Sequence, residues 1–173
     1  MGASDWHYTV AYQPDVKAAL QQLRRDVYDR GEYYRQPADN DLAMTEDEFR
    51  ARLDSRGEND GLNDAIVEDW LERKNLPVPS DPDTLLAAQP HSGTHSIIDI
   101  ANGVSDHPRF GTVSALTDEE LREAFGTTAP HSSQVQEWIR SGLSTRDKWV
   151  GTYVISYRNG EPDYIHFSGY SGD

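Results

Sequence analysis

The sequence of 173 residues contains no cysteine, and this absence excludes several kinds of chemistry. Disulfide bonds, thiol catalysis and zinc or iron–sulfur sites with cysteine ligands are all ruled out. A chain without cysteine is compatible with a reducing compartment, and we therefore expect a cytoplasmic protein. Its length suits a single domain that is stabilised by a hydrophobic core.

Long apolar stretches are also missing. No apolar run of about 18 residues is present, so the sequence predicts no membrane-spanning helix. The segment MGASDWHYTV lacks the basic and then apolar pattern of a secretory signal peptide. Trp6 stands where a myristoylation signal has serine or threonine. We expect a soluble protein without a membrane partner.

The common catalytic and nucleotide-binding motifs are absent as well. The chain contains neither GxxxxGK followed by serine or threonine nor GxGxxG, and it has no GxSxG or HExxH. The acidic stretch Glu58-Asn59-Asp60-Gly61 does not fit a calcium-binding EF-hand, because Arg56 and Val67 occupy positions that require carboxylates. We expect no cofactor.

Basic residues are scarce: 16 lysines and arginines face 30 acidic residues, which gives a formal charge of −14. Such a charge repels a phosphate backbone, so we expect no nucleic-acid partner. The excess is concentrated in residues 36–84, which carry fourteen acidic and five basic side chains. Two interpretations remain open: an acidic surface that keeps the protein soluble, or a site for a basic partner.

What is present is a strong hairpin signal in the last quarter of the chain, WVGTYVISYRNGEPDYIHFSGY. Two alternating apolar runs meet at Asn159-Gly160, a pair that favours a type I′ turn because both central residues need a positive φ. With a turn of two residues, Arg158 faces Glu161, Ile155 faces Tyr164, and Tyr153 faces His166.

This register predicts two different faces for the hairpin. In the first strand of the hairpin, the even-numbered residues Val150 and Val154 would share an aliphatic face with Ile165 and Phe167. The aromatic face would be either a second core, which we favour, or the floor of a groove. It would carry Trp149, Tyr153, Ile155, Tyr157, Tyr164, His166 and Tyr170.

Apolar periodicity and capping signals predict the other elements. Thr45 and Thr117 begin helices with capping boxes, and Gly31 and Gly126 end helices. Pro77, Pro79 and Pro82 predict a loop without a helix. The predicted strands are residues 6–12, 94–101 and 110–116, and the predicted helices are residues 14–30, 45–56, 62–71, 117–126 and 133–141.

The order of these elements indicates an α+β fold. We expect an antiparallel sheet of about five strands that ends in a C-terminal β-hairpin, with helices packed mainly on one face. Residues 1–173 would form a single domain with an acidic helical insertion at about 36–84. The pattern does not indicate an oligomeric state.

His91, His95 and Asp99 carry side chains of the kind that ligate transition metals. Histidines four residues apart converge on one ion only in a helix, and Pro90 and Gly93 favour a loop instead. On a strand, His95 and Asp99 would lie about 13 Å apart, too far to share an ion. We expect no metal.

A catalytic or ligand-binding pocket is a second possibility. Histidine titrates near neutral pH and tyrosine donates hydrogen bonds, so a cluster of these side chains with a carboxylate has acid–base chemistry available. The candidate pocket residues are His166, Tyr153, Tyr164, Asp99 and His95.

Two functional hypotheses follow. The first is a small acidic cytoplasmic protein that binds or neutralises a basic protein partner, as an immunity protein, an antitoxin or a regulatory protein does. The alternative is a small enzyme or ligand-binding protein that uses the His/Tyr pocket. The residues expected to bind a basic partner are Glu46, Asp47, Glu48, Glu58, Asp60, Asp64, Glu68, Asp69 and Glu72.

Overall fold

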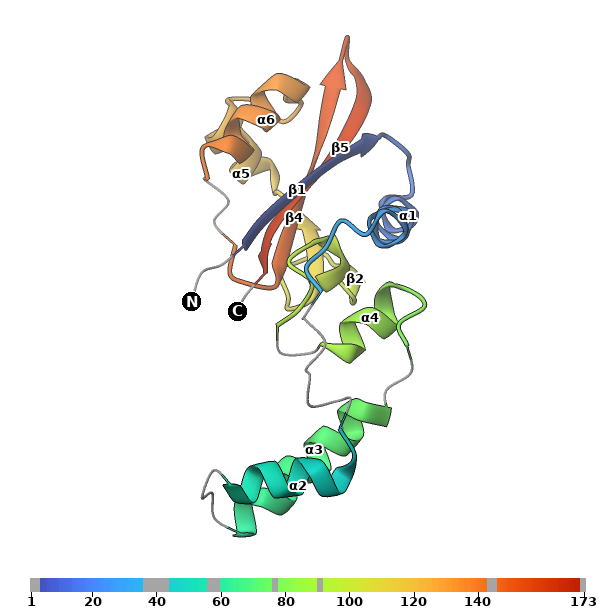
Figure 1. The fold of residues 1–173 in the computed structure, drawn as a ribbon. Coiled ribbons are helices and arrows are strands. Elements are labelled where there is room, and N and C mark those ends of the chain that lie inside the picture. The colour runs from blue at the N-terminus through green and yellow to red at the C-terminus, as the bar shows by residue number, and fades with distance from the viewer. Residues whose placement is uncertain are drawn as a thin grey trace.

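The computed structural model describes residues 4–35, 44–55, 60–75, 78–89, 92–142 and 146–171. Its centre is a five-stranded sheet with the strand order β1-β5-β4-β3-β2, in which β4 and β5 form the predicted hairpin (Figure 1). The strands are β1 (Ser4–Ala11), β2 (Gly103–Val104), β3 (Thr112–Ala115), β4 (Val150–Arg158) and β5 (Glu161–Ser171).

The sheet is mixed, which corrects the expectation of a purely antiparallel sheet. β5 pairs antiparallel with both β1 and β4, whereas β3 pairs parallel with β4 and with β2. The physical reason is the connection from β3 to β4. It contains two helices and is long enough to return the chain to the end of the sheet at which β3 begins, as a parallel pair requires.

The helices lie on both faces of the sheet, not mainly on one as expected (Figure 1). Helix α1 and the short turn η2 contribute to the core on one face, and α5 and α6 cover the other. The helices are α1 (Val16–Arg30), α2 (Glu46–Ser55), α3 (Asp60–Asn75), α4 (Pro82–Ala88), η2 (Ile97–Asp99), α5 (Asp118–Phe125) and α6 (Ser132–Arg140).

The capping signals locate the helix ends correctly. Thr117 and Glu120 form the predicted capping box of α5, and Gly126 ends the helix in the left-handed conformation with φ 71°. Thr45 and Glu48 form the corresponding box at the start of α2. Each cap satisfies backbone N–H groups that have no partner inside the first helical turn.

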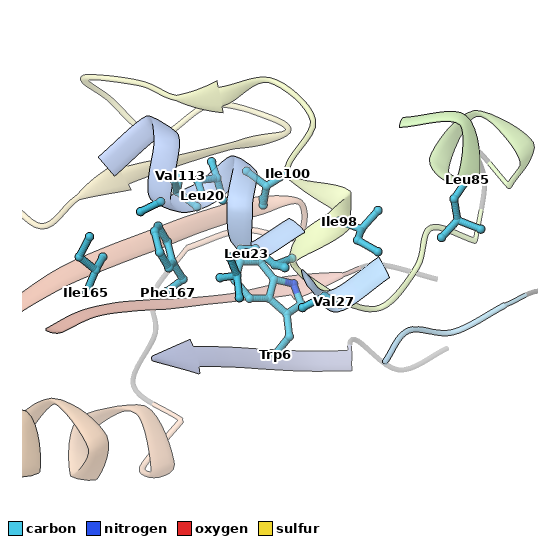
Figure 2. Packing of buried hydrophobic residues seen from close by; sticks show 12 residues of the cluster. Trp6, Leu20, Leu23, Val27, Leu85, Ile98, Ile100, Val113, Ile165 and Phe167 are labelled. Atoms are coloured by element: carbon cyan, nitrogen blue, oxygen red, sulfur yellow. The ribbon is translucent and has the colours of Figure 1, made fainter. Parts of the chain in front are cut away.

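The larger core lies between α1 and the sheet (Figure 2). Leu20, Leu23 and Val27 of α1 are buried together with Trp6 of β1 and Phe167 of β5. Leucine and valine at spacings of three and four residues form one apolar face of the helix, as the periodicity predicts. A smaller core of Leu116, Val135 and Val154 lies under α5 and α6.

Residues 94–101 do not form the predicted strand. Ile97, Ile98 and Ile100 are fully buried, and the chain makes a single 3-10 turn that is capped by Ser96 and Asp99. A short apolar run that is buried on all sides has no alternation, so its periodicity cannot separate a strand from a compact turn. The predicted strand 110–116 is present in shortened form as β3.

The proline-rich loop is also shorter than expected, because α4 begins at Pro82. Proline is favoured at the first helical position, where its missing N–H is not needed. Asp81 caps the helix by accepting hydrogen bonds from the backbone N–H groups of Asp83 and Thr84. Pro77 lies outside the described residues.

The hairpin contains a β-bulge, which the predicted register lacks. Arg158 pairs with Glu161 as predicted, but the pairing then shifts by one residue between Ser156 and Tyr157. Beyond the shift, Ile155 pairs with Ile165 and Tyr153 pairs with Phe167, so the predicted partners Tyr164 and His166 are wrong. A one-residue shift turns the following side chains of β5 to the opposite face.

Local hydrogen bonds explain the bulge at Asp163. Pro162 has no N–H to donate to the ladder. The N–H of Tyr157 donates instead to the carbonyl of Pro130 over 2.9 Å, and the carbonyl of Asp163 accepts from Tyr12 N–H over 3.0 Å. The Asp163 carboxylate forms an ion pair with Arg158, with 2.8 Å between the nearest nitrogen and oxygen. The backbone carbonyl and the side chain of the extra residue therefore both have partners.

None of the helices in the described ranges is long and apolar enough to cross a membrane.

The close packing of Trp6 on Gly169 predicts a large effect of a small substitution. A Cβ atom at Gly169 would lie 2.4 Å from Cζ2 of the Trp6 ring. We expect Gly169→Ala to lower the free energy of unfolding by about 1–3 kcal/mol, measured by urea denaturation. The cost should shrink in a Trp6→Phe background, where the ring is smaller. An equal cost in both backgrounds would contradict the packing.

Candidate functional site

His166, the first of the predicted pocket residues, is buried in the core under α6. Only 1% of its surface is exposed. Its Nδ1 lies 3.0 Å from the Thr9 hydroxyl, and its Nε2 lies 2.9 Å from the Ser156 hydroxyl and 3.4 Å from that of Ser132. Three hydroxyl groups on β1, β4 and α6 therefore surround the imidazole.

This environment favours the neutral ring. Burial lowers the pKa of His166 to about 4, and the nearby Asp163 carboxylate opposes this shift only weakly. Hydroxyl groups both donate and accept, so they satisfy either tautomer of a neutral imidazole. The arrangement is that of a hydrogen-bonded core histidine, which connects β1, β4 and α6.

Only one of the two predicted tyrosines, Tyr164, lies beside this histidine. Tyr153 is half-buried and packs against the core on the α1 face, where its ring lies 6.1 Å from that of Phe167. Burial raises its pKa. Tyr164 pairs with Ser156 and contacts the His166 ring edge-to-face at 6.3 Å. The bulge thus separates Tyr153 from the other two side chains.

Asp99 is buried, with 2% of its surface exposed, and its carboxylate is well satisfied. Its Oδ1 accepts from the N–H of Thr94 at 2.6 Å and from the Thr94 hydroxyl at 2.8 Å. Its Oδ2 accepts from the hydroxyl of Ser171 and from the N–H of Ser96 at 3.4 Å. This carboxylate ties the 92–99 segment to the end of β5.

His95 lies near the start of β1 in a left-handed conformation with φ 52°. Its Nδ1 is 3.1 Å from the Ser4 hydroxyl, and its ring stacks on Tyr34 at 4.6 Å. Ser4 and Thr9 point to opposite faces of β1, because side chains alternate along a strand. His95 and His166 are therefore on opposite faces of the sheet, and the five predicted residues do not form one pocket.

The structure also offers no metal centre within the ranges it describes. No group of three or more histidine, aspartate or glutamate side chains among those residues could hold an ion. His91, which the sequence analysis considered together with His95, lies outside the described residues.

The predicted acidic residues gather on one element, the helical hairpin of α2 and α3, which we call the acidic hairpin. The two helices carry nine acidic and four basic residues. Glu46, Asp47 and Glu48 occupy the first turn of α2, where negative charge complements the helix dipole. Glu58 lies outside the described residues.

Three of the acidic residues form a row along α3. Asp64, Glu68 and Glu72 follow one another at intervals of four residues, and Asp60 stands one interval earlier in the sequence. Positions four apart in a helix are neighbours on the same side. Asp64, Glu68 and Glu72 are all exposed, and so is the adjacent Asp69.

The acidic hairpin has a small core of its own. Phe49 and Leu53 of α2 are buried against Val67 and Trp70 of α3, and the rings of Phe49 and Trp70 stack at 4.7 Å. This cluster is separate from the two cores around the sheet. The hairpin extends away from the sheet, with α4 between the two (Figure 1).

A cleft that the sequence analysis did not predict lies between α4, the turn after η2 and the loop before β3. Its volume is about 430 Å³. Phe110 and Trp149 line it, although both were assigned to predicted strands. The sequence around Phe110, HPRFG, carried a loop signal in Pro108 and Gly111. Trp149 has a positive φ of 66°, which no local signal in the sequence indicates.

The buried His166 predicts a measurable pH dependence of stability. Its pKa is about 4 in the folded protein and near 6.5 when unfolded, so the unfolded chain binds more protons between these values. Stability should therefore fall as pH drops from 6.5 to 4, by up to about 3 kcal/mol.

Urea unfolding at several pH values checks this expectation. His166→Gln should lose this part of the pH dependence, whereas the control His7→Gln, which changes an exposed ring, should retain it. Equal pH dependence in all three proteins would show that His166 is not held neutral by the fold.

No protein-family model matches the chain, and the comparisons with curated proteins and with solved structures found no similar protein.

Proposed function

We propose that this protein binds a basic protein partner through the acidic hairpin. The observation that carries the proposal is the row of carboxylates at intervals of four residues on α3. The exposed members of the row present several negative charges along one side of a helix. Such an array complements lysine and arginine side chains on a partner, speeds association and selects against acidic proteins.

The row is unfavourable for the hairpin itself. Like charges four residues apart on a helix repel one another and destabilise it. Arg50 offsets part of this repulsion, because it pairs with Asp64 at 3.0 Å and with Glu46 at 2.9 Å. No ion pair to another described residue involves Glu68 or Glu72. The repulsion destabilises the helix, and the described residues offer Glu68 and Glu72 no ion pair that would offset it. This supports a role of the row in binding another molecule.

The basic residues of the hairpin are already engaged by its own groups. Arg73 lies 3.8 Å from Asp69, and the ammonium of Lys74 lies 4.6 Å from the centre of the Trp70 ring. These contacts leave the acidic side with an excess of charge. A general need for solubility is met by acids spread over the surface, whereas α2 and α3 carry nine of the 30 acidic residues of the chain.

The position of the hairpin also suits a docking element. Its core of Phe49, Leu53, Val67 and Trp70 holds the two helices together without help from the sheet. The side of α3 that carries the row is open for contact, because Asp64, Glu68 and Glu72 are exposed. The His/Tyr pocket has no comparable support, because its five residues lie on two faces of the sheet.

A set of charge-neutralising variants tests the proposal. The test variant combines Asp64→Asn, Glu68→Gln and Glu72→Gln. A matched control combines Asp29→Asn, Asp106→Asn and Glu123→Gln, which removes the same charge from exposed positions outside the hairpin. Proteins retained by the full chain from a lysate of the source organism would be identified, purified and titrated by calorimetry.

We expect a basic protein whose affinity falls about tenfold or more for the test variant and by less than about twofold for the control. The association rate should also fall with added salt. Equal losses in both variants would mean that only net charge matters. Unchanged binding in the test variant would refute the hairpin as the binding element.

A further inference from the structure

The cleft beside α4 has the size and lining of a small-molecule site. Its volume of about 430 Å³ falls within the usual range for ligand pockets. The lining is mostly apolar and comes from four separate parts of the chain. The residues that matter for the argument are Asp83 and Leu86 of α4, Asp99 of η2, and Asn102, Phe110 and Trp149.

Two aromatic rings form one side of the cleft. The rings of Phe110 and Trp149 lie 5.8 Å apart with an angle of 31° between their planes. Phe110 is 68% exposed, which is unusual for a phenylalanine that has a large apolar core available. A pair of partly exposed rings provides a face for a flat apolar group or for a cation.

The Trp149 ring is held firmly in position. Its backbone adopts the left-handed conformation with φ 66°, which is strained for a bulky residue. Trp149 N–H donates to the Tyr170 carbonyl over 2.8 Å, and its own carbonyl accepts from Gly111 N–H over 2.7 Å. Gly93 packs against the ring, since a Cβ there would lie 2.3 Å from it.

The loop that carries Phe110 is fixed in a similar way. The Asn102 side chain donates to the Phe110 carbonyl over 3.1 Å, and Asn102 N–H donates to the Gly111 carbonyl over 2.8 Å. Both rings thus project from backbone that is tied by hydrogen bonds. The cleft is preorganised, which reduces the entropy lost when a ligand binds.

The charged groups of the lining are both carboxylates. The Asp83 carboxylate accepts from Arg24 at 2.7 Å, and Arg24 is buried and also bonded to the Ile98 carbonyl. Asp99 is held by hydroxyl and N–H donors alone among the described residues. Arg24, which lies behind the lining, therefore balances only one of the two carboxylates. No lysine or arginine lines the cleft itself.

From these observations, we infer that the cleft binds a small organic cation with an aromatic body, such as an arylalkylammonium compound. The apolar body lies along Leu86 and Phe110, and the ammonium group is attracted by the ring faces and by the carboxylates. The inference concerns the body of the protein and stands independently of the acidic hairpin.

Calorimetric titration with three compounds of similar size tests the inference. The probes are 3-phenylpropylammonium, the neutral 3-phenylpropan-1-ol and the anion 3-phenylpropanoate. We expect the cation to bind at least about tenfold more tightly than the alcohol, and the anion not to bind. The chemical shifts that the cation changes in a ¹⁵N-labelled sample should belong to Asn102, Phe110, Gly111 and Trp149.

Variants locate the site. Phe110→Ala should weaken binding of the cation about three- to tenfold without loss of fold, because its side chain is exposed. Val78→Ala, which removes another exposed apolar side chain away from the cleft lining, should bind as the wild type does. The Asp64/Glu68/Glu72 variant should bind the cation as the wild type does. Loss of cation binding therefore reports on the cleft and not on partner binding by the acidic hairpin.

Three results would overturn the inference. Equal binding of the cation and the anion would remove the role of the carboxylates. Cation binding that Phe110→Ala leaves unchanged would be nonspecific attraction to an acidic protein. Absence of binding by all three probes would show that the cleft does not take a ligand of this class.

Discussion

The β-bulge at Asp163 is the constraint on which the rest of the structure depends. It inserts one residue into β5, so that Ile165 and Phe167 face α1 while His166 faces α6. Without the extra residue, two of the largest side chains in the main core would lie on the wrong face of the sheet. The bulge therefore decides both which helix packs on which face and where the histidine is buried.

The bulge also explains why the sheet has two unlike faces. The α1 face is apolar and contains most of the core, whereas the α6 face buries several hydroxyl groups around His166. A histidine held between hydroxyl groups suits a structural role. The surfaces with unexplained charge or exposed rings lie elsewhere, on the acidic hairpin and at the cleft beside α4. These two surfaces carry the functional proposals.

Sequence patterns predicted local features well and long-range ones less well. Thr117, Gly126 and the Asn159-Gly160 turn were identified because each acts on neighbouring residues. The bulge was missed because it depends on partners distant in sequence, such as Tyr12 and Pro130. The 94–101 segment was misassigned since complete burial removes alternation. The cleft was invisible because Phe110 and Trp149 meet only through tertiary folding.

The most direct test is the register of the hairpin in solution. Nuclear Overhauser effects between backbone protons of β4 and β5 in the labelled wild-type protein report it without any substitution. We expect cross-strand contacts of Ile155 with Ile165 and of Tyr153 with Phe167. Contacts of Ile155 with Tyr164 and of Tyr153 with His166 would mean a hairpin without the bulge, and would return His166 and Tyr153 to one face.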